Sequence, residues 1–343
     1  MDLPPALLSF YCPIASEVSP EHEAVAQEMY AWIHAMSLTS DNRQAKMLAQ
    51  AGAGFNSYFT PRARGELARA LSKYNVCAWI ANGMVQEIRD PGTFGAMAAR
   101  WARIMEEPAT CPADGIPMDF ALADAFSHIR RTLSPVKWQH FSAAQSHWMH
   151  GLAWENCLHQ VKGLTVHDYL SFRYVMSGCF AAAAFAYAVP ERHPSAEEWA
   201  HPKVRAAADA AMMVDALDND RYSYLKESLT EADKKTIFAA LRHENPALGR
   251  EEVIVRGVQL RDRILTLYLT LRGELLCDAS EGLRSYLTGL DLIIAGNLVF
   301  CADMGLRYGL PEGSVRTDAE PLDRTVAPPG IGAIDHWWAQ AGA

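Results

Sequence analysis

One stretch decides how this chain folds and what it can do: Asp218-Asn219-Asp220-Arg221-Tyr222-Ser223-Tyr224-Leu225-Lys226-Glu227. Within it, Asn219, Ser223 and Glu227 recur at every fourth position. An α-helix turns by about 100° per residue, so this spacing places the three side chains on one helical face. Their amide, hydroxyl and carboxylate oxygens form an all-oxygen set, which suits a hard cation such as Mg²⁺ that shares a phosphate. Lys226 adds a positive charge that can meet the same phosphate.

The same spacing is compatible with a polar face on a solvated helix, because Asn, Ser and Glu are common surface residues. Spacing alone does not decide between the two interpretations, and two arginines elsewhere in the chain matter for the resemblance described next. Arg173 lies well upstream of the stretch, and Arg307 lies well downstream with Tyr308 beside it.

The segment Asn219-Asp220-x-x-Ser223-x-x-Lys226-Glu227 resembles the second metal motif of microbial class I terpene synthases. Arg173 stands where that family carries its diphosphate-sensing arginine, and Arg307-Tyr308 stands where the family has an Arg-Tyr pair. The resemblance covers roughly residues 10–308.

The resemblance implies an all-α fold, a single-domain class I terpene synthase-like helical bundle around a central apolar cavity. It implies a cyclase that ionises and cyclises a linear prenyl diphosphate and releases diphosphate. Three Mg²⁺ ions are implied with diphosphate bound, and a homodimer would be ordinary. The implied diphosphate-binding residues are Arg173, Lys226, Arg307 and Tyr308, of which Arg173 and Tyr308 are also assigned to catalysis. The implied metal ligands are Asn219, Ser223 and Glu227.

The chain departs from the family at the facing helix, which ends near residue 90 and should carry an Asp-rich motif. Asn82-Gly83 stand where two aspartates are expected, and Glu87 is the remaining acid. Asp90 follows one turn later as a second candidate. Asn82 offers an uncharged amide oxygen and Gly83 offers none, so we expect weaker metal binding on this side. The alternative is a polar patch on an ordinary helix.

The helix that carries Arg173 is expected to break near Gly178, because glycine tolerates non-helical backbone angles. In the family, a carbonyl at this break faces the nascent cation. Either Ser177 or Gly178 supplies that carbonyl here, and both are assigned to catalysis.

Small side chains follow the break from Cys179 to Ala186. They indicate either close helix packing or a roomy cavity wall. The second interpretation slightly favours a C20 substrate, geranylgeranyl diphosphate, over the C15 farnesyl diphosphate. The candidate aromatic faces that stabilise cations are Trp79, Phe180, Phe185 and Phe300, and plain core packing is the alternative for each.

The bulk composition is that of a globular protein, with 50% hydrophobic residues and 21% charged residues among 343. A net charge of −9 argues against nucleic acid as a partner, because no basic surface is available to bind phosphates. The seven scattered cysteines contain no Cys-x-x-Cys pair and favour reduced thiols in a cytoplasmic protein. The N-terminus does not resemble a signal peptide, and the apolar run from Cys179 to Val189 is too short to cross a membrane.

Periodicity predicts about ten helices and no convincing strand. Residues 1–19 are expected to lie extended over the surface. The predicted helices cover residues 20–38, 41–51, 61–90, 92–107, 117–133, 137–161, 165–188, 200–227, 230–242, 249–273 and 277–306. We therefore expect one helical domain over residues 1–308 and a flexible, Pro/Gly-rich tail over 309–343. Within the tail, Trp337-Trp338 is expected either to dock on the surface or to cover a cavity mouth.

Two other functional classes remain compatible with the sequence. The first is a non-catalytic isoprenoid-binding protein that kept the helical cavity after losing the aspartates. The second is a di-iron or zinc site in a helical bundle, for which the candidates are His147, His150, Glu155 and His159.

Overall fold

The computed structural model describes residues 5–228, 235–303 and 315–342, with the side chains of residues 225–228 also outside the description. The described chain is almost entirely helical, and its only strands are two of three residues each. The all-α prediction is therefore confirmed. The chain divides into two compact units, which are described separately below.

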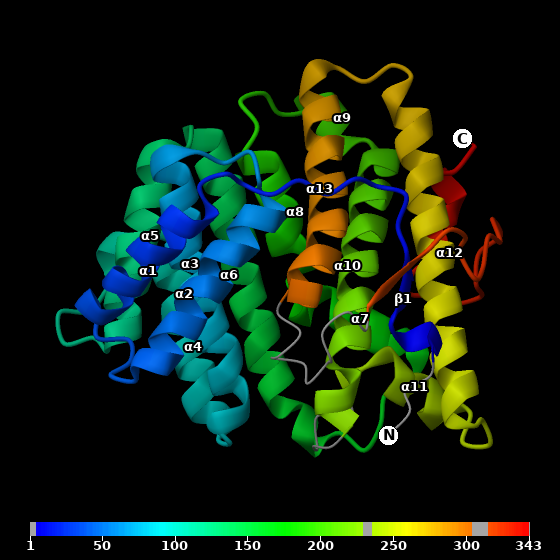
Figure 1. Cartoon of the computed structure of the whole chain (residues 1–343), viewed down its shortest axis with the longest axis horizontal. Coiled ribbons are helices and arrows are strands. Elements are labelled where there is room, and N and C mark those ends of the chain that lie inside the picture. The colour runs from blue at the N-terminus through cyan, green and yellow to red at the C-terminus, as the bar shows by residue number, and fades with distance from the viewer. Residues whose placement is uncertain (1–4, 229–234, 304–314, 343) are drawn as a thin grey trace. The chain divides into compact units, whose positions relative to one another are not determined.

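The first unit, here called the α3 unit, comprises residues 16–157 and 180–191. Its elements are α1 (His22–Ala35), α2 (Asn42–Phe59), α3 (Gly65–Glu87), α4 (Pro91–Glu106), the 3₁₀ turn η2 (Pro108–Thr110), α5 (Pro117–Thr132), α6 (Pro135–Asn156) and most of α8 (Cys179–Ala188). Helix α3 lies at its centre and packs against α1, α2, α5 and α6 (Figure 1).

Local chemistry sets the helix starts in this unit. Asp41 accepts the Arg43 amide at 2.8 Å and begins α2, while Pro117 and Pro135 occupy first turns, where their missing N–H is not needed. Helix α2 passes its predicted end at Ala51. The reason is Gly52, where a Cβ would meet Val76 at 2.5 Å, so the glycine permits close packing against α3.

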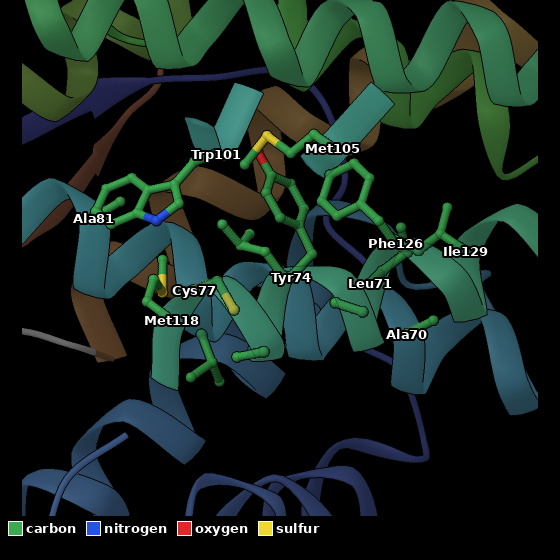
Figure 2. Close-up of a cluster of buried hydrophobic side chains, with 14 of the residues drawn as sticks. Ala70, Leu71, Tyr74, Cys77, Ala81, Trp101, Met105, Met118, Phe126 and Ile129 are labelled. Carbon is green, nitrogen blue, oxygen red and sulfur yellow. The ribbon is translucent and has the colours of Figure 1, made fainter. Parts of the chain in front are cut away.

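Aromatic side chains fill the core of the α3 unit. The buried Tyr74 ring lies edge-on to Phe126 at 5.1 Å, and its hydroxyl donates to Gln145 Oε1 at 2.6 Å. Figure 2 shows Leu71, Tyr74 and Cys77 of α3 among Trp101 and Met105 of α4 and Met118, Phe126 and Ile129 of α5.

The second unit, here called the α10 unit, comprises residues 1–15, 158–179 and 192–343. Its described elements are η1 (Pro5–Leu7), β1 (Ser9–Tyr11), η3 (Cys157–Gln160, which begins at the unit boundary), α7 (Val166–Met176), α9 (Ala196–Ala200), α10 (Pro202–Ser228), α11 (Ile237–Glu244), α12 (Arg250–Leu276), α13 (Glu281–Asp303), β2 (Arg316–Asp318) and η5 (Asp335–Gln340). Helix α10 packs along both α12 and α13 (Figure 1).

The two ends of the chain meet within the α10 unit. Strand β1 pairs in parallel with β2, with Phe10 opposite Thr317. Leu7 and Phe10 are buried, so the prediction that residues 1–19 lie over the surface is wrong for this part. Hydrogen bonds to buried arginines, described below, hold the segment in place.

The predicted tail also has a docked part. Trp337 and Trp338 lie in η5 and are buried, and η5 contacts α10. The docking prediction for this pair is confirmed, whereas the flexibility of the tail as a whole stays a prediction. The predicted boundary at 308/309 lies outside the described residues.

Helix α13 is the one described helix that is long and apolar enough to cross a membrane. However, 67% of its apolar window is buried inside the structure, which is typical of a core helix. The sequence analysis did not single out this helix.

We expect Phe126→Ala to lower the free energy of unfolding by about 3–5 kcal/mol, because it leaves a cavity among the aromatic rings of the α3 unit. The matched control is Phe120→Ala on the same helix, where the side chain is 41% exposed, with an expected change within about 0.5 kcal/mol. Urea denaturation of both variants measures the difference. Equal losses would contradict this account of the core.

Candidate active site

Helix α10 presents the predicted metal ligands Asn219 and Ser223. Asn219 is half-buried and Ser223 is buried, with the Ser223 hydroxyl 3.5 Å from the Asp220 carbonyl. Glu227 and Lys226 continue the same helix, but their side chains lie outside the described residues. Arg307 and Tyr308 also lie outside them.

Arg173 of α7 reaches the metal motif directly. Its Nη2 donates to Asn219 Oδ1 at 3.0 Å and to the Ala216 carbonyl at 3.0 Å, and lies 2.8 Å from Asp220 Oδ1. The side chain is buried. The structure thus brings together two residues that the sequence analysis assigned to one site from distant positions.

The helix that carries Arg173 breaks at the predicted place. Helix α7 ends at Met176, Gly178 has φ +75°, and α8 begins at Cys179. The Ser177 hydroxyl donates to the Arg173 carbonyl at 2.6 Å, so the break is tied to the residue that precedes it by one turn. A positive φ strains any residue with a Cβ, which explains glycine here.

Asp220 anchors one flank of the metal motif. Tyr169 of α7 donates its hydroxyl to Asp220 Oδ2, and the Ile237 amide donates to the same oxygen at 2.8 Å. Burial raises the pKa of Asp220, while the Arg173 charge and the Tyr169 hydrogen bond act in the opposite direction. This carboxyl therefore holds α7, α10 and the start of α11 together.

The opposite face of α10 holds buried charges that the sequence analysis missed. Asp218 receives two hydrogen bonds from Arg261 of α12, at 2.8 and 2.6 Å, and Arg221 also lies beside it. A signal was present in the sequence: Asp218 and Arg221 stand one turn apart, on the side of the helix away from the predicted ligands. Their partner Arg261 gave no local signal.

Asp215 lies one turn before Asn219. Its Oδ1 is buried, and none of the described residues makes a hydrogen bond to it. Burial, and secondarily the Asp218 charge, raise the pKa of Asp215 to about 8, although Arg173 acts to lower it. This carboxyl is therefore protonated at neutral pH in the absence of a cation.

The predicted second wall lies on the last two turns of α3. Asn82, Gly83 and Glu87 are all exposed, and a Cβ at Gly83 would meet no atom of the described residues within 4 Å. Asn156 of α6 holds this helix end, because its amide nitrogen donates to the Val85 carbonyl at 2.8 Å and to the Ile88 carbonyl at 2.7 Å. The sequence analysis did not single out Asn156.

Asp90 has a local role. It begins α4 as the N-cap, with Oδ2 accepting the Thr93 amide at 2.7 Å and the Thr93 hydroxyl at 2.6 Å. These hydrogen bonds lower the pKa of Asp90. Capping accounts for the residue without a metal.

The four aromatic candidates differ in environment. Trp79 and Phe180 are half-buried, and the Phe180 ring lies 5.5 Å from the His147 ring. Phe185 is buried among the core rings, 5.1 Å from Phe141, and Phe300 is buried in α13. Core packing accounts for the last two.

Histidines do not build a second metal centre in the described part of the chain. No group of three or more His, Cys, Asp and Glu side chains gathers there. His150 Nδ1 lies 2.9 Å from the Ser146 carbonyl, and His147 faces Phe180. The di-iron or zinc interpretation has no support from these residues.

The donors on α10 fit a hard divalent cation. Asn219 and Ser223 offer neutral oxygens on one face, and the unpartnered Asp215 Oδ1 lies one turn away. A buried oxygen without a partner is costly, and a nearby cation would satisfy it. On this test the residues present are compatible with a divalent metal.

A comparison with protein families gives a direct result. A family model described as terpene synthase family 2, C-terminal metal binding, matches residues 81–263. The chain belongs to the terpene synthase family. The resemblance drawn from the α10 motif is thus confirmed, and the matched domain implies divalent-metal binding.

Characterised relatives agree along nearly the whole length of the chain. Phomopsene synthase of Allokutzneria albata is 28% identical over 98% of this chain and 97% of the relative. Spiroviolene synthase of Streptomyces violens is 29% identical over 99% and 98%. The protein is therefore a terpene synthase, a lyase, and the general expectation of a terpene cyclase is supported.

Solved structures give the same fold. The SVS_A2 protein from ancestral sequence reconstruction aligns with a TM-score of 0.82 at 27% identity, covering 99% of both chains. An α-eudesmol synthase aligns with a TM-score of 0.75 over 86% of this chain and 98% of its own, at 17% identity. The predicted class I terpene synthase-like fold is confirmed.

We expect Asp215→Asn to change how stability depends on pH. The folded protein keeps the Asp215 proton up to about pH 8, whereas the unfolded chain loses it near pH 4. Between these values the folded state binds more protons, so the wild type loses stability as pH rises. Asparagine stays neutral, so the variant's advantage in melting temperature should widen from pH 5 to pH 8.

The matched control is Asp278→Asn, at an exposed position of the same unit. Its difference from the wild type should stay constant over this range. A constant difference for Asp215→Asn as well would contradict the buried, protonated carboxyl.

Proposed function

We propose that this terpene synthase is a Mg²⁺-dependent class I cyclase, which ionises a linear prenyl diphosphate, cyclises the chain and releases diphosphate. The observation that carries the proposal is Arg173 Nη2 between Asn219 Oδ1 and Asp220 Oδ1, at 3.0 and 2.8 Å. A guanidinium held beside an oxygen-ligand helix is suited to bind phosphate and sense the metal site together.

In this proposal Asn219, Ser223 and Glu227 hold Mg²⁺, and three ions accompany the bound diphosphate. Bound Mg²⁺ would supply the positive charge that stabilises diphosphate as it leaves. Lys226, Arg307 and Tyr308 add contacts to the same group. Each of these residues lies in or beyond the α10 motif, where the sequence resemblance assigns it.

Arg173 has two roles in the mechanism. Its guanidinium exchanges part of its contact with Asn219 and Asp220 for phosphate oxygens when substrate binds. The Ser177 hydroxyl donates to the Arg173 carbonyl, so a movement of Arg173 is transmitted through this hydrogen bond to the helix break. We infer that a carbonyl at Ser177 or Gly178 faces the cation formed after ionisation, and half-buried Trp79 and Phe180 offer ring faces to it.

The second wall, at the end of α3, has fewer acidic ligands than the family pattern. Glu87 supplies the negative charge of this wall and Asn82 a neutral oxygen. Asp90 is the weakest candidate because it caps α4. With one carboxylate in place of an acidic pair, we expect weak metal affinity on this side.

The C20 substrate is slightly favoured over C15. A diterpene cyclase, DtcycA of a Streptomyces species, is 30% identical over 64% of this chain. A 4-epi-cubebol synthase of Streptosporangium roseum, which cyclises farnesyl diphosphate, is 23% identical over 87% of it. The small side chains after Gly178 also favour the C20 substrate, because they can form a roomy cavity wall.

The deciding experiment incubates purified protein with C10, C15 and C20 prenyl diphosphates, with and without Mg²⁺, and analyses the hydrocarbons formed. We expect one chain length to give cyclic product, no product with a chelator, and a loss of activity on the order of a hundredfold or more in Glu227→Ala. Glu251→Ala, an exposed acid of α12, is the control and should retain activity.

No product from any chain length by folded protein in Mg²⁺ would refute the cyclase proposal. The alternative, an isoprenoid-binding protein without activity, then predicts a rise in melting temperature with prenyl diphosphate. The exposed Asn82-Gly83 pair, which lacks acids, would explain the lost ionisation.

A further inference from the structure

The N-terminal segment of the chain binds the face of α10 that lies opposite the proposed metal ligands. Arg221 lies between the ligand positions 219 and 223 but points to the other side of α10, because two residues turn the helix by about 200°. Its side chain is 1% exposed. A charge buried behind the ligand face requires matching partners.

Those partners are backbone carbonyls of the N-terminal segment, residues 6–11. Arg221 donates to the carbonyls of Ala6 at 2.8 Å, Leu7 at 3.3 Å and also Ser9. The guanidinium also lies over the Phe10 ring at 3.7 Å from its centroid. One arginine thus satisfies three carbonyls on a single short segment.

Arg261 of α12 also binds the N-terminal segment. It donates to the Tyr11 carbonyl at 2.6 Å while its other nitrogens hold Asp218. Burial acts to lower the pKa of Arg261, but Asp218 and Asp262 outweigh it and raise the pKa. Burial lowers the pKa of Arg221 to about 10, which still leaves the side chain charged at neutral pH. The N-terminal segment therefore bridges α10 and α12 through two charged arginines.

The segment is fixed from its outer side as well. The Arg316 amide of β2 donates to the Leu8 carbonyl at 2.8 Å, and the Phe10 ring stacks on Tyr222 of the motif at 4.8 Å. Residues 6–11 therefore cannot shift without moving a residue of the motif.

Hydrogen bonds to a charged, planar group are directional, whereas apolar contacts allow a helix to rotate or slide. The direction of Arg221 and Asp218 therefore fixes the rotation of α10. The same rotation aims Asn219 and Ser223, because all four side chains project from one rigid helix.

We propose that residues 6–11 and Arg221 position the metal ligands. The Mg²⁺ concentration that the enzyme requires then depends on the contacts between Arg221 and this segment. The inference rests on the proposed function. Arg221 acts through Asn219 and Ser223 and is a positioning residue. A small misplacement of reacting groups can lower a rate on the order of a hundredfold.

The experiment compares Arg221→Met and Phe10→Leu with the wild type, each assayed well below its melting temperature. Arg221→Met removes the guanidinium group and its hydrogen bonds. Phe10→Leu keeps an apolar side chain but removes the ring against which the guanidinium lies. The Mg²⁺ concentration for half-maximal activity, the KM for the prenyl diphosphate and kcat are measured, together with the rise in melting temperature that Mg²⁺ and inorganic diphosphate give each variant. We expect both variants to raise the Mg²⁺ requirement and KM tenfold or more, with Arg221→Lys restoring part of the loss.

The matched control is Arg263→Ala on α12. Arg263 is half-buried and also donates to backbone carbonyls, those of Ala327 and Pro328, but not to residues 6–11. Its Mg²⁺ requirement should equal that of the wild type.

Variants with lower melting temperatures but an unchanged Mg²⁺ requirement and KM would overturn the inference, because the segment would then be only structural. If Arg221→Met does not fold, Phe10→Leu decides on the same criteria. A wild type that makes no product would refute the cyclase proposal instead, so the two failures are distinguishable.

Discussion

Four buried charges on α10 and α12 constrain the α10 unit: Asp218, Arg221, Arg261 and Asp262. Removing an ion from water costs several kcal/mol, so this arrangement persists only because each charge has a partner. Arg261 holds Asp218 with two hydrogen bonds, and Asp262 accepts the Leu322 amide at 2.8 Å. The same cluster therefore binds residues 6–11 on one side and residue 322 on the other. The buried charged side chains of α10 and α12 therefore bind segments from near both ends of the chain.

Helix α10 combines this fixed face with the face that carries the proposed metal ligands. Arg173 and Asp220 occupy the flank between them, and Tyr169 connects that flank to α7. The described part of that face has a protonated Asp215 and the neutral donors Asn219 and Ser223, so it has little negative charge. In our proposal Glu227 supplies a carboxylate there, and the anionic diphosphate supplies the remaining negative charge that binds the cations. The metal and the substrate are thus expected to bind as one assembly.

The sequence predicted the helices well, and it placed Arg173 and Asn219 in one site, where the structure brings the two side chains together. Periodicity and proline positions mark helix starts reliably, and Gly178 marked the break because only glycine adopts φ +75° without strain. The sequence could not predict contacts between distant residues. Nothing local to Arg261 indicates Asp218 as its partner, and nothing in residues 1–19 indicates that Phe10 is buried against Arg221. The helix predicted over residues 41–51 continues to Phe59, and Gly52 within it permits close packing against Val76. Asp90 stays a candidate ligand, and its capping role could not be separated from that one in the sequence, because both roles use the same carboxylate oxygens.

The end of α3 tolerates a change of residue at positions 82 and 83. The amide of Asn156 holds the carbonyls at residues 85 and 88, so the backbone around Asn82 and Gly83 is set by α6 and not by the side chains at those two positions. Gly83 borders open space, and a helix interior accepts almost any residue more readily than glycine. A terpene synthase with acids at both positions can therefore share this backbone, and exchanging the two residues would alter the charge at the end of α3 without altering the path of the chain.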